Sequence, residues 1–179
     1  MADARNTLRP QDILIALKLS ILEHLDHWTQ AQMAQSLGIS PAEVAFALRR
    51  LKKHHLVNPN EQKILPGAMC EFLVHGIKYV FPAEIGRTTR GMPTGSSHEV
   101  FKRKLRVPPE YALVWPTADG SVRGQSLEPL YETVPLAAKQ DTKLYELLSI
   151  LDALRVGGAR ETAIAARELE SRLLRKEAA

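Results

Sequence analysis

Two complete helix-start signals on either side of a single glycine constrain this 179-residue chain more than any other feature. Thr29 and Ser40 each stand where a side chain can cap a helix, and each is followed three residues later by a glutamine or glutamate that can return the hydrogen bond. Gly38, between them, suits the left-handed conformation that ends a helix. The sequence therefore predicts helices over residues 30–37 and 41–54, joined by a turn too short to leave them collinear.

Helical spacing assigns the inward faces of this helix pair. We expect two apolar faces to contact each other: Met33, Ala34 and Leu37 on the first helix, and Val44, Leu48 and Leu51 on the second. An αα corner in a helical protein of any function has the same pattern, so packing alone remains an alternative. The spacing of Ala34, Gly38 and Val44, with basic residues closing the second helix, favours DNA recognition instead.

The flanking segments extend the pattern. Residues 10–25 have helical apolar spacing on more than one stripe, so this helix should be covered on two sides. Residues 56–65 contain two short apolar runs around a turn-forming cluster, which predicts a small β-hairpin. One helix, a helix pair and a hairpin follow one another in the order of a winged helix.

Over residues 10–66 the chain resembles the winged helix-turn-helix transcription regulators of the MarR-like type. The resemblance implies a homodimer that places residues 41–54 in the major groove of double-stranded DNA and rests the hairpin against the DNA backbone. In one respect the sequence departs from that pattern. Its wing is short and offers only Lys63, where many relatives carry an arginine-rich tip.

The second helix of the pair provides most of the candidate DNA contacts. Its outward positions carry small or apolar groups first, suited to thymine methyls, and then cations suited to phosphates, which position a protein more than they specify sequence. The predicted set is Ala42, Ala45, Phe46, Arg49, Arg50 and Lys53 on this helix, with Gln30, Gln32, Ser40 and Lys63 beside it. A competing interpretation makes Phe46 a contact to another protein and the basic cluster a solvated helix end, where cations favour the helix dipole.

The middle of the chain, after residue 66, has a less regular pattern than the first part. Residues 66–81 predict a helix that Pro82 stops. Residues 82–124 contain five prolines and five glycines without a sustained period, which predicts an irregular, partly mobile connection, although residues 114–116 also suit a strand. Residues 78–106 hold seven Lys or Arg against two Asp or Glu, so this segment could follow phosphates or be a solvated loop.

Three further helices are predicted near the C-terminus, over residues 127–136, 141–155 and 161–176. They are too few for a large core of their own, so we expect them to cover the helix at 10–25, within the chain or across a dimer axis. The predicted fold is mainly α. It consists of a winged helix-turn-helix domain (1–66), a helix plus an irregular Pro/Gly-rich connection (67–126), and a C-terminal helical region for dimerisation or partner binding (127–179).

Residue patterns for chemistry are sparse. His24 with His27, and Cys70 with His75, do not make up a four-ligand metal set, and no phosphate loop or catalytic order is present. We therefore expect no metal, no cofactor and no enzymatic activity. The single Cys70 suits a small buried side chain.

The start of the chain has no charged leader, and no apolar run approaches about 18 residues, so a cytoplasmic protein without a membrane association is expected. Two functions remain. The first is a DNA-binding regulator, in the form of a dimeric repressor. The alternative is an interaction protein, such as an antitoxin or complex subunit, that binds a protein partner through the winged helix and the C-terminal helices.

Overall fold

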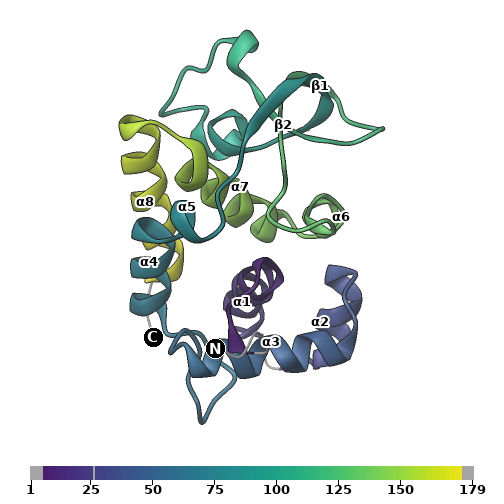
Figure 1. The fold of residues 1–179 in the computed structure, drawn as a ribbon, viewed down its shortest axis with the longest axis vertical. Coiled ribbons are helices and arrows are strands. Elements are labelled where there is room, and N and C mark those ends of the chain that lie inside the picture. Colours follow the sequence, from purple (N-terminus) through teal and green to yellow (C-terminus); the bar gives the residue numbers. More distant parts are fainter. Residues whose placement is uncertain (1–5, 26, 175–179) are drawn as a thin grey trace.

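The computed structural model describes residues 6–25 and 27–174, and in this part of the chain it contains eight α-helices and a small three-stranded sheet (Figure 1). The helices are α1 (Pro10–Leu22), α2 (Gln30–Leu37), α3 (Pro41–Lys53), α4 (Pro66–His75), α5 (Ile77–Val80), α6 (Val134–Gln140), α7 (Thr142–Val156) and α8 (Ala159–Leu173). The strands are β1 (Ile85–Pro93), β2 (Leu113–Pro116) and β3 (Val122–Leu127). The expectation of a mainly helical chain is confirmed. None of the helices within these residues has the length and apolar character needed to cross a membrane.

Figure 1 shows α1, α2 and α3 at one end of the molecule, the sheet at the other end, and α7 between them. Helices α4 and α8 lie against each other along one flank, and α6 contacts α2 on the opposite flank. One continuous hydrophobic core joins residues from α1 to α8. The helix pair is therefore supported from behind by the C-terminal half of the chain.

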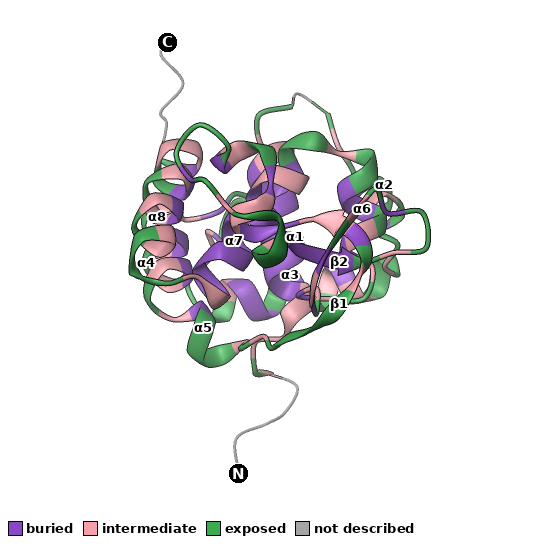
Figure 2. Cartoon of the chain, turned by 90° about the horizontal axis from the view of Figure 1, so that it is seen from above, coloured by how far each residue is buried: buried purple, intermediate pink, exposed green. Residues whose placement is uncertain are grey.

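Helix α1 is the central element of this core. Every residue from Asp12 to Ser20 is buried, because α3 covers one side of the helix and α7 covers another (Figure 2). The Nζ atom of Lys18 donates a hydrogen bond to Oδ2 of Asp141 at 2.7 Å, and the other oxygen of that carboxylate caps α7 through the Leu144 N–H. The prediction that C-terminal helices cover the first helix is confirmed for α7, within a single chain.

Several predicted helix boundaries were wrong. The first helix ends at Leu22, three residues early, and the segment predicted as one helix over 66–81 breaks at Gly76 into α4 and α5. The short helix predicted over 127–136 is displaced, because β3 continues to Leu127 and α6 begins only at Val134. Helix α7 matches its prediction to within one residue at each end. Helix α8 ends at Leu173, and the predicted end at residue 176 lies outside the described residues.

The largest error concerns residues 82–124, which are folded into strands and short 3₁₀ turns, namely η2 (Gly95–Ser97), η3 (Glu99–Phe101) and η4 (Pro109–Tyr111). Strand β1 pairs antiparallel with both β2 and β3, and β2 pairs parallel with β3, so the sheet closes on itself. Glycine permits this closure. A Cβ atom on Gly91 would lie 2.0 Å from the Trp115 carbonyl oxygen, and one on Gly124 would lie 2.4 Å from that of Ala112.

A buried carboxylate anchors the sheet to α7. Oδ2 of Asp152 accepts hydrogen bonds of 2.7 Å from the Thr94 hydroxyl and from the Trp115 indole N–H, and Oδ1 accepts one of 2.8 Å from Arg155. The Arg155 guanidinium also donates to the Phe81 carbonyl oxygen at 3.0 Å. Burial raises the pKa of Asp152, whereas its ion pair and hydrogen bonds favour the charged form. Segments distant in sequence thus meet at one side chain.

Close strand packing makes Gly91 intolerant of a side chain. We expect Gly91→Ala to lower the free energy of unfolding by about 1 to 3 kcal/mol, because the new methyl group must displace backbone atoms of β2. Urea unfolding followed by circular dichroism measures this change. Gly67→Ala is the matched control, since a Cβ there meets no atom within 4 Å and lies in the first turn of α4, where alanine is the better helix former. Equal effects of the two substitutions would contradict the assigned closure.

Candidate nucleic-acid interface

The orientation of α3 is set by the turn that precedes it. Helix α2 ends at Gly38, which has a φ of 65°, and the Ser40 hydroxyl then accepts the Glu43 backbone N–H at 3.2 Å to begin α3. The Thr29 side chain likewise caps α2, so both predicted N-terminal caps, Thr29 and Ser40, are confirmed. Leu136 and Thr133, at the start of α6, lie against Gly38, so the C-terminal half of the chain braces the turn.

Helix α3 has sharply divided faces. Its inner positions Val44, Ala47, Leu48 and Leu51 are buried against α1 and α2. Its outer positions Ala42, Phe46, Arg49 and Lys53 are exposed, and their spacing of four, three and four residues places them along one stripe of the helix. We call these four residues the outer stripe. The described C-terminal helices leave the outer stripe uncovered.

The outer stripe carries positive charge on an aromatic support. The guanidinium carbon of Arg49 lies 4.7 Å from the centre of the Phe46 ring, and the Phe46 side chain is 48% exposed. This cation–π contact restricts Arg49 without neutralising its charge. Within the described residues, neither Arg49 nor Lys53 forms an ion pair with a carboxylate. Both charges are available to an external anion.

Arg50 does not belong to this surface, which corrects its prediction as a phosphate contact. It is only 5% exposed, and its side chain turns inward to the start of α1. Its Nε and Nη2 atoms donate to the two carboxylate oxygens of Asp12 at 2.8 and 2.6 Å, forming a bidentate ion pair. The hydrogen bonds that Arg50 donates to Asp12 raise the pKa of Arg50 further above its usual range.

Glu43 also differs from its prediction. It was expected to close a capping box with Ser40, but its carboxylate instead accepts hydrogen bonds from Arg50 Nη2 at 2.7 Å and from Gln11 Nε2 at 3.2 Å. The only acidic residue on α3 therefore turns its carboxylate toward the buried Arg50 and away from the outer stripe. This arrangement leaves the outer stripe with a net positive charge.

The remaining predicted residues are divided among other roles. Gln32 completes the α2 capping box, because its Oε1 accepts the Thr29 N–H at 2.9 Å and the Thr29 hydroxyl at 3.1 Å. Gln30 and Ala45 are half-buried, and Ser40 is exposed but uses its hydroxyl as the α3 cap. These side chains flank the outer stripe without extending its charge.

The predicted hairpin is reduced to its minimum. A single isolated bridge joins Val57 and Ile64, flanked by a hydrogen bond from the Asn58 N–H to the Lys63 carbonyl oxygen at 2.9 Å. His55, with a φ of 57°, lets the chain turn out of α3 into this hairpin. Lys63 Nζ lies 3.5 Å from Glu61, and because both side chains are exposed this pair is weak.

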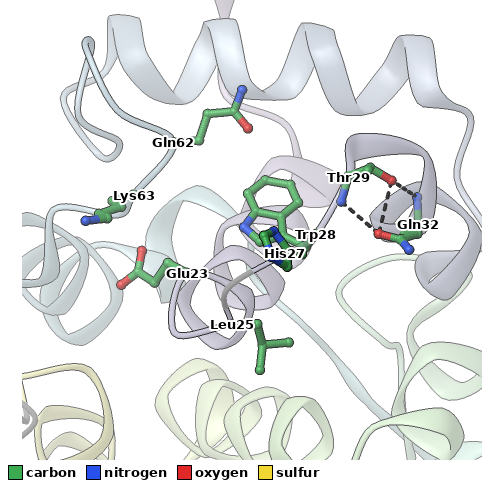
Figure 3. A pocket seen from close by; sticks show the side chains of 8 residues that line it. All are labelled: Glu23, Leu25, His27, Trp28, Thr29, Gln32, Gln62 and Lys63. Atoms are coloured by element: carbon green, nitrogen blue, oxygen red, sulfur yellow. Dashed lines mark hydrogen bonds between the residues drawn. The ribbon is translucent and has the colours of Figure 1, made fainter.

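A cleft of about 480 Å³ separates the hairpin from α2 (Figure 3). Trp28 lies in its middle, with Gln62 and Lys63 on the hairpin side and Thr29 and Gln32 on the α2 side. The structure thus brings two predicted site residues, Gln32 and Lys63, to one cleft. Trp28 was not among the predicted site residues, and nothing in the sequence pattern marks it as part of a cleft.

Within the described chain, no group of three His, Cys, Asp or Glu side chains is arranged to hold a metal ion. Comparison of the chain with protein families, with curated proteins and with solved structures finds no match.

The buried Asp12–Arg50 pair should contribute strongly to stability. We expect Arg50→Ala to lower the free energy of unfolding by about 3 to 5 kcal/mol, because it leaves the Asp12 carboxylate, fully buried in α1, without its partner. Arg49→Ala, one position away and exposed, should change it by less than about 0.5 kcal/mol. Urea titration measures both variants.

A double variant separates the ion pair from general packing loss. Asp12→Ala with Arg50→Ala should be more stable than the sum of the single losses predicts, because neither charge is then buried alone. Strictly additive losses would show that the two side chains do not depend on each other.

Proposed function

We propose that this chain is a winged helix-turn-helix DNA-binding regulator that inserts α3 into the major groove of double-stranded DNA. The observation that carries the proposal is the outer stripe, an uncovered helical face with two unpaired cations, presented after a tightly turned helix pair. An α-helix with such a face fits the width of the major groove. The sequence resemblance described above supports the same assignment.

The chemistry of the stripe favours contacts with the DNA backbone over base reading. Arg49 and Lys53 suit phosphates, whereas Ala42 and the Phe46 ring offer only apolar contact, for which thymine methyl groups are the natural partners. The short hairpin, with one cation already near Glu61, adds little to the electrostatic attraction. We therefore expect the affinity for DNA to depend strongly on salt concentration and only modestly on base sequence. In this proposal the active form is a homodimeric repressor, as the resemblance implies.

Counterion release tests the role of the stripe. We expect Arg49→Ala with Lys53→Ala to weaken binding to every duplex and to flatten the plot of log affinity against log salt by about 2, since about 0.9 is lost per phosphate contact. Fluorescence anisotropy with the chain's own promoter fragment and with a mixed-sequence duplex measures both slopes.

The matched control is Arg160→Ala with Arg167→Ala, which removes the same charge from exposed positions on α8, away from α3. This variant should keep the salt slope of the unaltered chain. If both double variants change the slope equally, the attraction comes from net charge and not from α3. No slope change in the α3 variant would refute the proposal.

A second function is favoured by one specific observation, the exposed Phe46 ring beside Ala42. An exposed aromatic side chain surrounded by small side chains is typical of hot spots in protein–protein interfaces. In this alternative the chain is an interaction subunit, and Phe46 inserts into a partner. Phe46→Ala would then abolish assembly with a purified partner, while loss of Arg49 and Lys53 would alter mainly the association rate.

A further inference from the structure

A second cavity, of about 580 Å³, lies at the opposite end of the molecule from the outer stripe. It is bordered by the end of β1, by η2 and η3, by the loop at residues 105–107, by the start of β3 and by α7. Its volume falls in the range of small-molecule sites, about 300 to 1,000 Å³. Much of its wall is apolar, with Pro93, Leu105, Val107, Ala112 and Val122.

His98 places a hydrogen-bond donor at this cavity. The side chain is only 6% exposed, and its Nδ1 accepts the Val100 backbone N–H at 3.2 Å, which caps η3. The ring packs edge-on against Tyr145, with centres 4.3 Å apart, and the Tyr145 hydroxyl is held by the Pro93 carbonyl oxygen. Burial lowers the pKa of His98, so the ring is neutral at pH 7.

The tautomer of this neutral ring follows from its hydrogen bond. Because Nδ1 is the acceptor, the single proton is on Nε2. Among the residues that the structure describes, no acceptor receives a hydrogen bond from Nε2. His98 lines the cavity, so its Nε2–H can donate a hydrogen bond to an acceptor that binds there.

The charges around the cavity define the ligand further. Lys102 is paired with Glu99, so these two lining residues cancel each other. Arg106 also lines the cavity, and it is exposed and forms no ion pair in the described part of the chain. One unpaired cation matches one negative charge. The site therefore suits a monoanion better than a phosphate dianion or a cation.

We propose that this cavity binds a small organic monocarboxylate, whose carboxylate accepts the Nε2–H of His98 and pairs with Arg106. The apolar body of the ligand lies against Leu105, Val107 and Val122. This assignment is independent of DNA binding, because it uses residues of the C-terminal half of the chain alone.

The test uses hexanoate and benzoate as probes, with hexanamide and benzamide as neutral matches of nearly the same shape. Titration of the full chain is followed by calorimetry and by the NMR signals of the His98 ring. We expect both carboxylates to bind and to shift the His98 signals, and both amides to bind at least about tenfold more weakly, since they lack the charge that Arg106 recognises.

Two variants locate the site. Arg106→Gln should reduce carboxylate affinity about tenfold, to the level of the amide, whereas Arg103→Gln, an exposed arginine of the same segment that does not line the cavity, should leave it unchanged. His98→Asn should keep the cap on Val100, because an asparagine side chain can accept the same N–H, but should lose the donor that faces the ligand.

Three results would overturn the carboxylate site. No shift of the His98 signals by either carboxylate up to about 10 mM, which corresponds to negligible affinity, overturns the proposal. Equal binding of acids and amides also overturns it, as does an equal loss with Arg103→Gln and Arg106→Gln. If His98→Asn fails to fold, the arginine pair still decides the question. None of these measurements involves DNA, so failure here leaves the α3 proposal standing.

Discussion

The bidentate contact between Asp12 and Arg50 fixes the face that α3 presents to solvent. Asp12 is fully buried at the start of α1, and its two oxygens hold two nitrogens of Arg50 at hydrogen-bond distance. A planar guanidinium matches a carboxylate in one orientation, so this contact sets the rotation of α3 about its own axis. Once that rotation is fixed, Phe46 and Arg49 point outward. Glu43 is then drawn into the same buried cluster and away from the surface.

Helix α1 connects the helix pair to the rest of the chain. It contacts α3 on one side and α7 on the other, and the Lys18–Asp141 ion pair joins it to the cap of α7. Helix α7 in turn holds the sheet through Asp152 and Arg155. Three ion pairs, Asp12–Arg50, Lys18–Asp141 and Asp152–Arg155, thus connect the helix pair to the strands. Buried charges that are held by hydrogen bonds favour one arrangement of the elements over others of similar hydrophobic burial.

Local signals in the sequence predicted the helix pair well. The hydrogen bonds of a helix cap join residues only a few positions apart, so the neighbouring sequence predicts them. This holds for Thr29, Gly38 and Ser40. The fate of Arg50 was not predictable in this way. Arg50 directly follows the outward Arg49 on a helix whose last turn is basic. Its partner Asp12 lies 38 residues earlier, in an apolar run with no period that points to it.

Strands β1 and β3 were missed for a related reason, whereas β2 lies where residues 114–116 suggested a strand. Residues 85–93 contain glycines, threonines and arginines instead of alternating apolar side chains, because most of these positions are exposed and Gly91 lies against the backbone of β2. The cue of period two therefore disappears, and the glycines look like breaks in structure. Pairing of β1 with β3 depends on residues more than thirty positions apart, and composition does not reveal it.

The mutual pairing of β1, β2 and β3 has a consequence for how this molecule meets others. An open sheet offers a row of unpaired amides and carbonyls onto which a foreign strand can be added, and such additions lead to both recognition and aggregation. Where each strand already has a neighbour on both sides, that route is largely closed. A molecule that docks on this end of the chain must recognise side chains, and unrelated chains have little backbone template on which to accumulate.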